Sequence, residues 1–190
     1  VLLPFAPADL DSVLVDVAAE RRDMRSVTMA EARMGDGQVL RAVNDLFIGP
    51  RSHSSALYEL SHGARSEFQS SSGLIVSTGL GSSAWLKSIV TGSMAIAQEL
   101  GIATAHAHYQ ALPWSELALV FAVREPFPTR TSAATLVYGR VDPEHPLKVR
   151  SRMPDNGIIF SDGMEADFMQ FTAGMEVTIA PSSISGRLVV

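Results

Sequence analysis

The chain of 190 residues contains no cysteine, so disulfide bonds and thiolate metal sites are excluded. This absence fits a cytoplasmic protein, which is the location we expect. There is also no apolar run of roughly 18 residues or more, so we expect no membrane-spanning helix and no membrane partner. The net charge is −5 and no basic stripe with interleaved aromatic residues occurs, so nucleic acid is not an expected partner.

What the chain does contain is enough apolar sequence for a sizeable core, because hydrophobic residues make up 46% of it. The first residue, Val1, is not an initiator methionine, and we expect a preceding N-terminal part to be missing. Apolar residues at helical spacing predict a short helix over residues 10–20.

The most informative stretch runs from Gly73 to Trp85, where an apolar segment leads into a loop rich in glycine, serine and threonine. Residues 82–100 then predict the longest helix of the chain. A strand that ends in such a loop and leads into a helix makes an anion site, because the first helical N–H groups lack intrahelical partners. Gly79 and Gly81 permit positive φ or the close approach of a ligand. The loop also offers hydroxyl donors from Ser77, Thr78, Ser82 and Ser83.

Two interpretations of this stretch stay open. It is either a site for phosphate or ribose, or an ordinary strand-to-helix turn in which Ser82 caps the helix. It is not a P-loop, because no Gly-Lys-Ser/Thr follows and Lys87 lies too far along the helix.

Most of the remaining chain predicts short strands separated by turns, as in a β-meander or sandwich. Asp36-Gly37 predicts a hairpin between a strand over 25–34 and its return strand over 39–48. Asp162-Gly163 is consistent with a second such turn. Further strands are expected over residues 56–60, 67–70, 117–123, 135–141, 147–150, 157–161, 167–171, 176–180 and 187–190, and residues 102–115 show no regular pattern.

Asn44 and Asp45 stand out because they are polar residues inside an apolar strand, where an unpartnered polar group is costly. They are either a satisfied pair at a strand end or a pair that recognises hydroxyl groups. His106 and His108 would face one way on a strand but lack a clear third ligand, so no metal site is expected. The role of Arg124, on a phosphate or in an ion pair with Glu125, stays open.

Three of these motifs resemble motifs of the NAD kinase family and follow one another along the chain in that family's order. The stretch 73–85 (Gly-Leu-Ile-Val-Ser-Thr-Gly-Leu-Gly-Ser-Ser-Ala-Trp) resembles that family's Gly-Leu-Ile-Val-Ser-Thr-Pro-Thr-Gly-Ser-Thr-Ala-Tyr signature. Asn44-Asp45 resembles its Asn-Glu pair, and Asp162-Gly163 with residues 174–179 resembles its late hairpins. The resemblance covers about residues 20 to 190.

The resemblance implies an α+β, mostly β fold: the β-sandwich-like C-terminal domain of a NAD kinase, with one long helix after the Ser/Gly-rich loop. Residues 1–23 would be a linker and helix that join a missing N-terminal α/β domain, and residues 24–190 would be the β-rich NAD-binding domain. The chain departs from the family pattern at Asp45, Gly79, Leu80, Ser83 and Trp85.

By resemblance, the function is that of a NAD kinase-like phosphotransferase that converts NAD to NADP with ATP or polyphosphate and Mg²⁺, and this chain alone is expected to be inactive. Its partners would be a small-molecule nucleotide and further copies in a homo-oligomer. The nucleotide-binding residues implied are Asn44, Asp45, Thr78, Gly79, Gly81, Ser82, Ser83, Ala84, Trp85 and Asp162. The catalytic base is expected on the missing N-terminal part, and Gly35-Asp36-Gly37 is explained as a hairpin turn. The alternatives are a nucleotide-binding relative without catalysis and a kinase of a different, sugar-like or lipid, hydroxyl.

Overall fold

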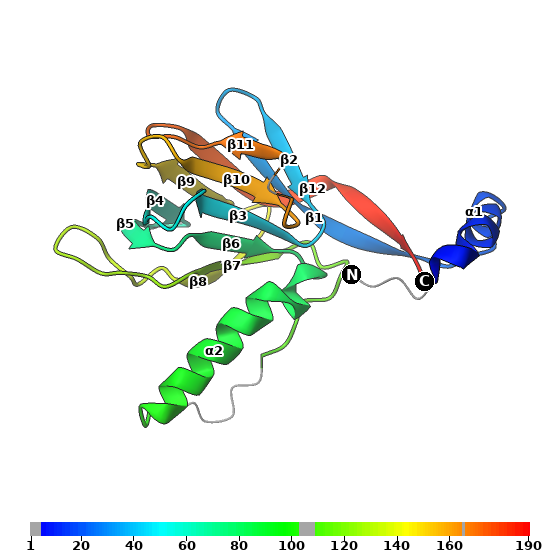
Figure 1. The fold of residues 1–190 in the computed structure, drawn as a ribbon, viewed down its shortest axis with the longest axis horizontal. Helices are drawn as coiled ribbons and strands as arrows, with labels where there is room; N and C mark the ends of the chain where they lie inside the picture. Colours follow the sequence, from blue (N-terminus) through cyan, green and yellow to red (C-terminus); the bar gives the residue numbers. More distant parts are fainter. Residues whose placement is uncertain (1–4, 103–108, 165) are drawn as a thin grey trace.

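The computed structural model describes residues 5–102, 109–164 and 166–190, and in these ranges two antiparallel six-stranded sheets form the body of the molecule (Figure 1). The first sheet has the order β2 (Val39–Ala42), β1 (Met24–Met34), β12 (Glu176–Val189), β9 (Leu147–Ser151), β4 (Ala56–His62) and β5 (Arg65–Ser71). The second has the order β11 (Phe168–Gln170), β10 (Gly157–Ser161), β3 (Asp45–Pro50), β6 (Leu74–Ser77), β7 (Leu119–Val123) and β8 (Tyr138–Val141). The helical elements are η1 (Pro7–Asp9), α1 (Leu10–Ala18), η2 (Gly81–Ser83) and α2 (Trp85–Glu99).

The core lies between the two sheets and follows from the alternation of side chains along each strand. In β9, Leu147 and Val149 are buried while Lys148 and Arg150 are exposed. Strands of the second sheet are instead buried along their whole length, as in β3, β6, β7 and β10, because further residues cover the outer face of that sheet. The expected mostly β, sandwich-like fold with one long helix is confirmed.

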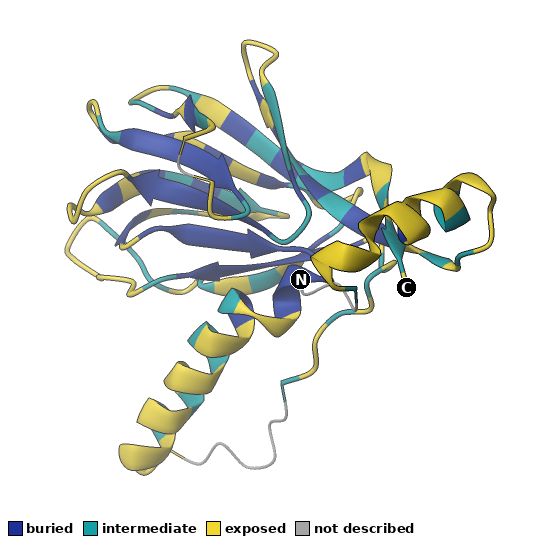
Figure 2. Cartoon of the chain, turned by 45° about the vertical axis from the view of Figure 1, so that its right-hand side comes forward, coloured by how far each residue is buried: buried dark blue, intermediate teal, exposed yellow. Residues whose placement is uncertain are grey.

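The long helix α2 provides part of that cover at its N-terminal end. Leu86 is fully buried and packs with Val120 and Ala122 of β7. Beyond this contact the helix extends away from the sheets and is mostly exposed (Figure 2). No helix in the described part of the chain has the length and apolar character needed to cross a lipid bilayer. Gly101, at φ 72°, ends the helix as the sequence predicts.

The hairpin predicted at Asp36-Gly37 joins β1 to β2, but the return strand expected over residues 39–48 is wrong. The strand is interrupted at Val43 and Asn44, so that β2 belongs to the first sheet and β3 to the second. Conversely, the two strands expected over 176–180 and 187–190 are one long strand, β12, with an irregular register opposite the middle of β1. In both cases pairing with distant strands decides the outcome.

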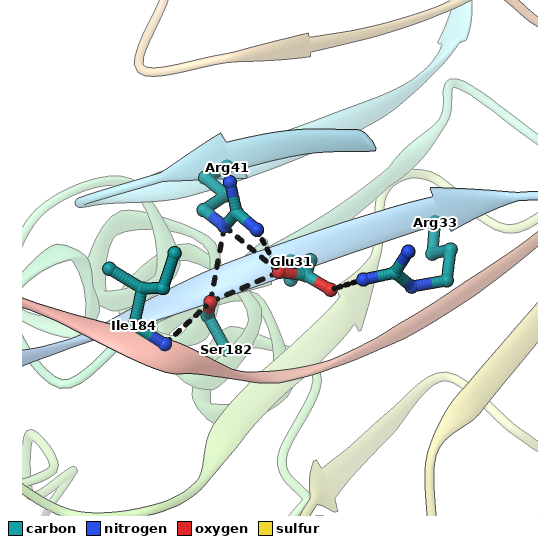
Figure 3. A network of polar contacts seen from close by, with 5 residues as sticks. All are labelled: Glu31, Arg33, Arg41, Ser182 and Ile184. Carbon is teal, nitrogen blue, oxygen red and sulfur yellow. Dashed lines mark hydrogen bonds and ion pairs between the residues drawn. The ribbon is translucent and has the colours of Figure 1, made fainter. Parts of the chain in front are cut away.

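A network around Glu31 fixes the edge of the first sheet (Figure 3). The Glu31 carboxylate, in β1, accepts hydrogen bonds from Arg33 at 2.6 Å, from Arg41 of β2 and from the Ser182 hydroxyl of β12 at 3.1 Å. Partial burial opposes ionisation, but these bonds outweigh it and lower the pKa of Glu31. Three adjacent strands are therefore held by one carboxylate, which has no room left for a ligand role.

The boundary expected between residues 23 and 24 coincides with the start of β1 at Met24. Figure 1 shows α1 next to the ends of β1 and β12, at one end of the sandwich. The division of the chain into a linker and a β-rich domain stays a prediction.

Candidate functional site

The break between β2 and β3 is held by Asp162, which lies 118 residues further along the chain. Its carboxylate accepts hydrogen bonds from the backbone N–H groups of Val43 at 2.9 Å, Asn44 at 2.6 Å and Asp45 at 3.2 Å. Asp162 itself has φ 53° and is followed by Gly163 at φ 75°, so the expected turn is also present. The side chain of Asp162 therefore positions the Asn44 segment through the backbone.

Asp45 starts β3, and its carboxyl is buried, with 9% of the residue exposed. It accepts a hydrogen bond from the hydroxyl of Ser77, its register partner in β6. Burial raises the pKa of Asp45; the Ser77 bond acts against this and the nearby negative charge of Asp162 adds to it. The Asp45 side chain is thus enclosed by its own chain and favours the protonated form more than an exposed aspartate does.

The hydroxyl groups of the Ser/Gly-rich loop donate within the chain. Besides the Ser77 bond, Thr78 donates to the Val43 carbonyl at 2.6 Å, Ser82 to the Gly79 carbonyl at 2.7 Å and Ser83 to the Leu80 carbonyl at 3.1 Å. Thr78 and Ser82 are also buried. These bonds shape the loop and tie it to the Asn44 segment, and a contact of these hydroxyls with a ligand stays a prediction.

Gly79 and Gly81 serve close packing, since neither has the positive φ that the sequence interpretation allowed for. A Cβ on Gly81 would lie 2.2 Å from the Asn44 carbonyl oxygen and 2.8 Å from a carboxylate oxygen of Asp45. A Cβ on Gly79 would lie 2.1 Å from the Pro113 carbonyl oxygen. The absence of a side chain at Gly81 lets the loop approach the Asn44 segment, and its absence at Gly79 lets the loop approach Pro113.

Sequence reasoning missed the segment that supports the loop from the other side. The Tyr109 hydroxyl donates to the Ser82 carbonyl at 2.6 Å, and the Leu112 N–H donates to the Ser82 hydroxyl at 3.0 Å. Ser82 therefore is not the cap of α2, which begins three residues later after the η2 turn. Residues 109–114 show no periodicity, so no pattern in the sequence could have pointed to them.

The groups that stay available to a ligand are few and lie together. Asn44 is half-buried, and its side-chain amide bonds to no residue in the described ranges. Ser83 and Ala84 are exposed, and the first N–H groups of α2 have no side-chain cap. Gly81, at the start of the η2 turn that leads into α2, lies against the Asn44 carbonyl, so the structure brings Asn44 next to this turn.

Trp85, the first residue of α2, is half-buried against the outer face of the second sheet. Its ring is stacked on Phe47 of β3, with 6.0 Å between ring centroids and 6° between planes. The Arg124 guanidinium lies 5.4 Å from the Trp85 ring centroid, in a cation–π contact. Trp85 is therefore partly a packing residue, and the exposed portion of its ring remains free to contact a ligand.

A resident Mg²⁺ does not fit this site. In residues 5–102, 109–164 and 166–190 no group of three His, Asp or Glu side chains converges as a metal site. Asp45 and Asp162, the two carboxylates present, already accept hydrogen bonds from the chain. His106 and His108 lie outside the described residues.

No model of a known protein family and no curated protein sequence matches the chain. Among solved structures, the crystal structure of yeast NADH kinase complexed with NADH is similar to the whole chain, with a TM-score of 0.70 and 15% sequence identity. The chain spans 50% of the length of that protein. At such identity the likeness concerns the fold, and it confirms the fold that the motifs led us to expect. This chain therefore has the fold of a segment that makes up half of a yeast NADH kinase.

Proposed function

We propose that this chain is the nucleotide-binding part of a NAD kinase-like phosphotransferase, which transfers a phosphoryl group from ATP or polyphosphate to NAD. The observation that carries the proposal is the packing of the Ser/Gly-rich loop onto Asn44, in a fold shared with an NADH kinase. Two motifs about 30 residues apart are built into one site, and the only side-chain amide there is left without a partner among the described residues.

In this proposal the ligand contacts divide between three groups. The Asn44 amide both donates hydrogen bonds to ribose hydroxyls and accepts hydrogen bonds from them, which suits hydroxyl groups because they too both donate and accept. The uncapped N–H groups at the start of α2 and its dipole favour a phosphate. The exposed part of the Trp85 ring offers a flat apolar surface to a base. Asp45 contributes less than its position in the motif suggests, because Ser77 and Gly81 enclose its carboxyl.

One observation favours a second candidate, nucleotide binding without catalysis. Both carboxylates at the site, Asp45 and Asp162, are occupied by hydrogen bonds from the chain, so neither stands ready as a general base. Phosphoryl transfer depends on positioning and on charge neutralisation by Mg²⁺, and here the metal would arrive on the phosphates of ATP. The base and the ATP contacts would have to come from outside the residues described.

Calorimetric titration with NAD and NADH tests the proposal, on the wild type, on Asn44→Ala and on Asn156→Ala. Asn156 is a matched control because it is the other asparagine of the chain and lies at the far end of β3, beside Arg51. We expect Asn44→Ala to weaken binding about tenfold to a hundredfold, as for the loss of one or two hydrogen bonds, and Asn156→Ala to bind as the wild type does.

Formation of NADP by the protein with ATP and Mg²⁺ then separates the two candidates. Product formation supports the kinase, whereas NAD binding without product supports the binding protein. If the folded protein binds neither NAD nor NADH, or if both asparagine variants lose affinity equally, the proposed site is wrong. Phosphorylation of a sugar-like or lipid hydroxyl in place of NAD would point to the remaining alternative.

A further inference from the structure

Strand β8 is an open edge of the second sheet. It stands last in the strand order of the described ranges and pairs only with β7. The Val123 N–H donates to the carbonyl of Val137, the residue directly opposite, and in an antiparallel pair such bonded positions alternate with unbonded ones. The N–H and C=O groups of Tyr138 and Arg140 therefore point away from β7, and no described strand bonds to them. Such free groups are a template for a further strand.

The free edge of β8 is complementary to itself. When a second β8 is placed antiparallel to it with a two-fold axis at Gly139, Tyr138 lies directly opposite Arg140 of the second copy. In this register every free N–H of one edge meets a free C=O of the other, and the two glycines face each other at the axis without side chains. The side chains of Tyr138 and Arg140 are both exposed and lie on the same face of the sheet, because they are two residues apart. Each tyrosine ring therefore meets a guanidinium group across the edge.

The helix α2 overhangs the same edge. Figures 1 and 2 both show it leaving the sheets and extending past β7 and β8. Leu86 packs on β7, and four apolar residues follow on the same side of the helix at helical spacing, yet these four are only half-buried: Ile89, Val90, Met94 and Ala97. A helix of this length is marginal in water on its own, so it depends on cover for its apolar side.

An apolar hollow of about 580 Å³ separates this side of α2 from the sheet. On the sheet side its walls include Ala122 and Val123 of β7 and Val137 and Tyr138 of β8, and none of the described residues that line it is charged. Tyr138 belongs both to the hollow and to the free edge, so the two form one continuous surface. A two-fold axis through Gly139 stands perpendicular to the antiparallel sheet. It therefore keeps both α2 helices on the same face, where each overhangs the other copy.

We propose that this chain forms a two-fold symmetric homodimer, in which the β8 edges pair and each α2 helix covers the outer face of the other copy next to that edge. The occupant is a second copy because the same edge, turned about a two-fold axis, satisfies the free backbone groups, the glycine at the axis and the tyrosine–arginine contacts together. Within each chain Glu116 forms an ion pair with Arg140, which offsets the repulsion between the two arginines across the axis. This surface uses neither Asn44 nor the Ser/Gly-rich loop, so the dimer does not depend on the proposed function.

Sedimentation equilibrium of the whole chain tests the proposal, because a dimer has twice the mass of one chain and its fraction rises with concentration. The edge is probed by Arg140→Pro, which removes an N–H that points out of the sheet and leaves the bonds to β7 in place. Its matched control is Arg140→Ala, which removes the same side chain but keeps the N–H. We expect the proline variant to weaken the dimer at least about a hundredfold, because two edge hydrogen bonds are lost and their carbonyl partners stay unpaired, and the alanine variant to weaken it at most about tenfold.

The helix is probed by Ala97→Glu, which brings a carboxylate to the wall of the hollow that the second copy covers. Its matched control is Ala95→Glu, the same substitution two residues away, on the exposed side of α2 that does not line the hollow. We expect Ala97→Glu to weaken the dimer at least about tenfold and Ala95→Glu to dimerise as the wild type does. Both positions have room for a glutamate in the monomer, so this pair decides the question even if circular dichroism shows that Arg140→Pro does not fold.

Cross-linking checks the register of the pairing. The chain has no cysteine, so Tyr138→Cys and Arg140→Cys each introduce the sole thiol. In the proposed register these two positions face each other, whereas like positions lie about 7 Å out of step along the strands. A short bismaleimide should therefore cross-link a mixture of the two variants severalfold more than either variant alone.

The proposal is overturned if the chain stays monomeric, if the dimer survives both Arg140→Pro and Ala97→Glu, or if Ala95→Glu weakens it as much as Ala97→Glu does. Preferential cross-linking within one single-cysteine variant would place the pairing in another register and would also refute the proposal.

Discussion

The contact between Gly81 and the Asn44 segment gives a direct test of how the site is built. In Gly81→Ala the new methyl group would lie 2.2 Å from the Asn44 carbonyl oxygen and 2.6 Å from its carbon, where ordinary contacts begin at 3.4 Å. Both atoms belong to the backbone of a strand end that Asp162 holds, so neither side can yield without breaking hydrogen bonds. The substitution must displace one of the two motifs by about 1 Å.

Overpacking of this kind costs about 1–3 kcal/mol, and a clash between two backbone segments belongs at the upper end, near 3 kcal/mol. For a chain of this size such a loss lowers the melting temperature by roughly 6–12 °C. We also expect weaker NAD binding, because Asn44 is the residue displaced. Thermal unfolding followed by circular dichroism and calorimetric titration with NAD measure the two effects.

The matched control is Gly92→Ala, in the exposed middle of α2, where an added Cβ meets nothing within 4 Å. There alanine is the better helix former, so we expect a gain of about 1 kcal/mol and unchanged NAD binding. If Gly81→Ala is as stable as Gly92→Ala, the close approach of loop and strand does not exist in solution and the site described above is wrong.

Three further substitutions probe the two carboxylates of the site. Asp162→Ala removes the acceptor of three backbone N–H groups and should lower the free energy of unfolding in urea by about 3 kcal/mol. Asp162→Asn keeps one oxygen and tolerates the positive φ, so it should lower this free energy by about half as much. Equal losses in the two variants would mean that the hydrogen bonds contribute nothing. Because burial raises the pKa of Asp45, the folded state holds this proton more tightly than the unfolded state does, and stability falls as pH rises from the ordinary value of 3.8 through the raised one. Asp45→Asn should remove that fall, so its stability relative to the wild type should increase over this pH window; parallel curves would contradict the assigned burial.

Much of the fold follows from local pattern in the sequence. Alternating apolar and polar residues predict strands such as β4 and β9, and the apolar run at residues 117–123 predicts the buried β7. Asp36-Gly37 predicts the hairpin between β1 and β2. The strand, loop and helix of residues 73–100 are also predicted in the right order, because each depends on the chemistry of neighbouring residues. These motifs were sufficient to anticipate the shared fold at 15% identity.

The construction of the candidate site depended on tertiary structure. The apolar pattern of residues 39–48 continues through Val43 and Asn44, and only Asp162, supplied by a distant hairpin, provides the acceptors that divide it between two sheets. The loop hydroxyls look the same in sequence whether they bind a ligand or a carbonyl, and the packing of the loop decides for the carbonyl.

A pocket on the outer face of the second sheet, lined by Arg51 and Arg124 among others, shows the same limit more clearly. Its walls come from β3, β10, α2 and three loops, and Arg51 and Arg124 are 73 residues apart in the chain. Residue pattern determines which segments become strands and helices, since side-chain periodicity and backbone propensity act over a few residues. Which side chains then meet is determined by sheet order and register, because these place residues together that no local spacing relates.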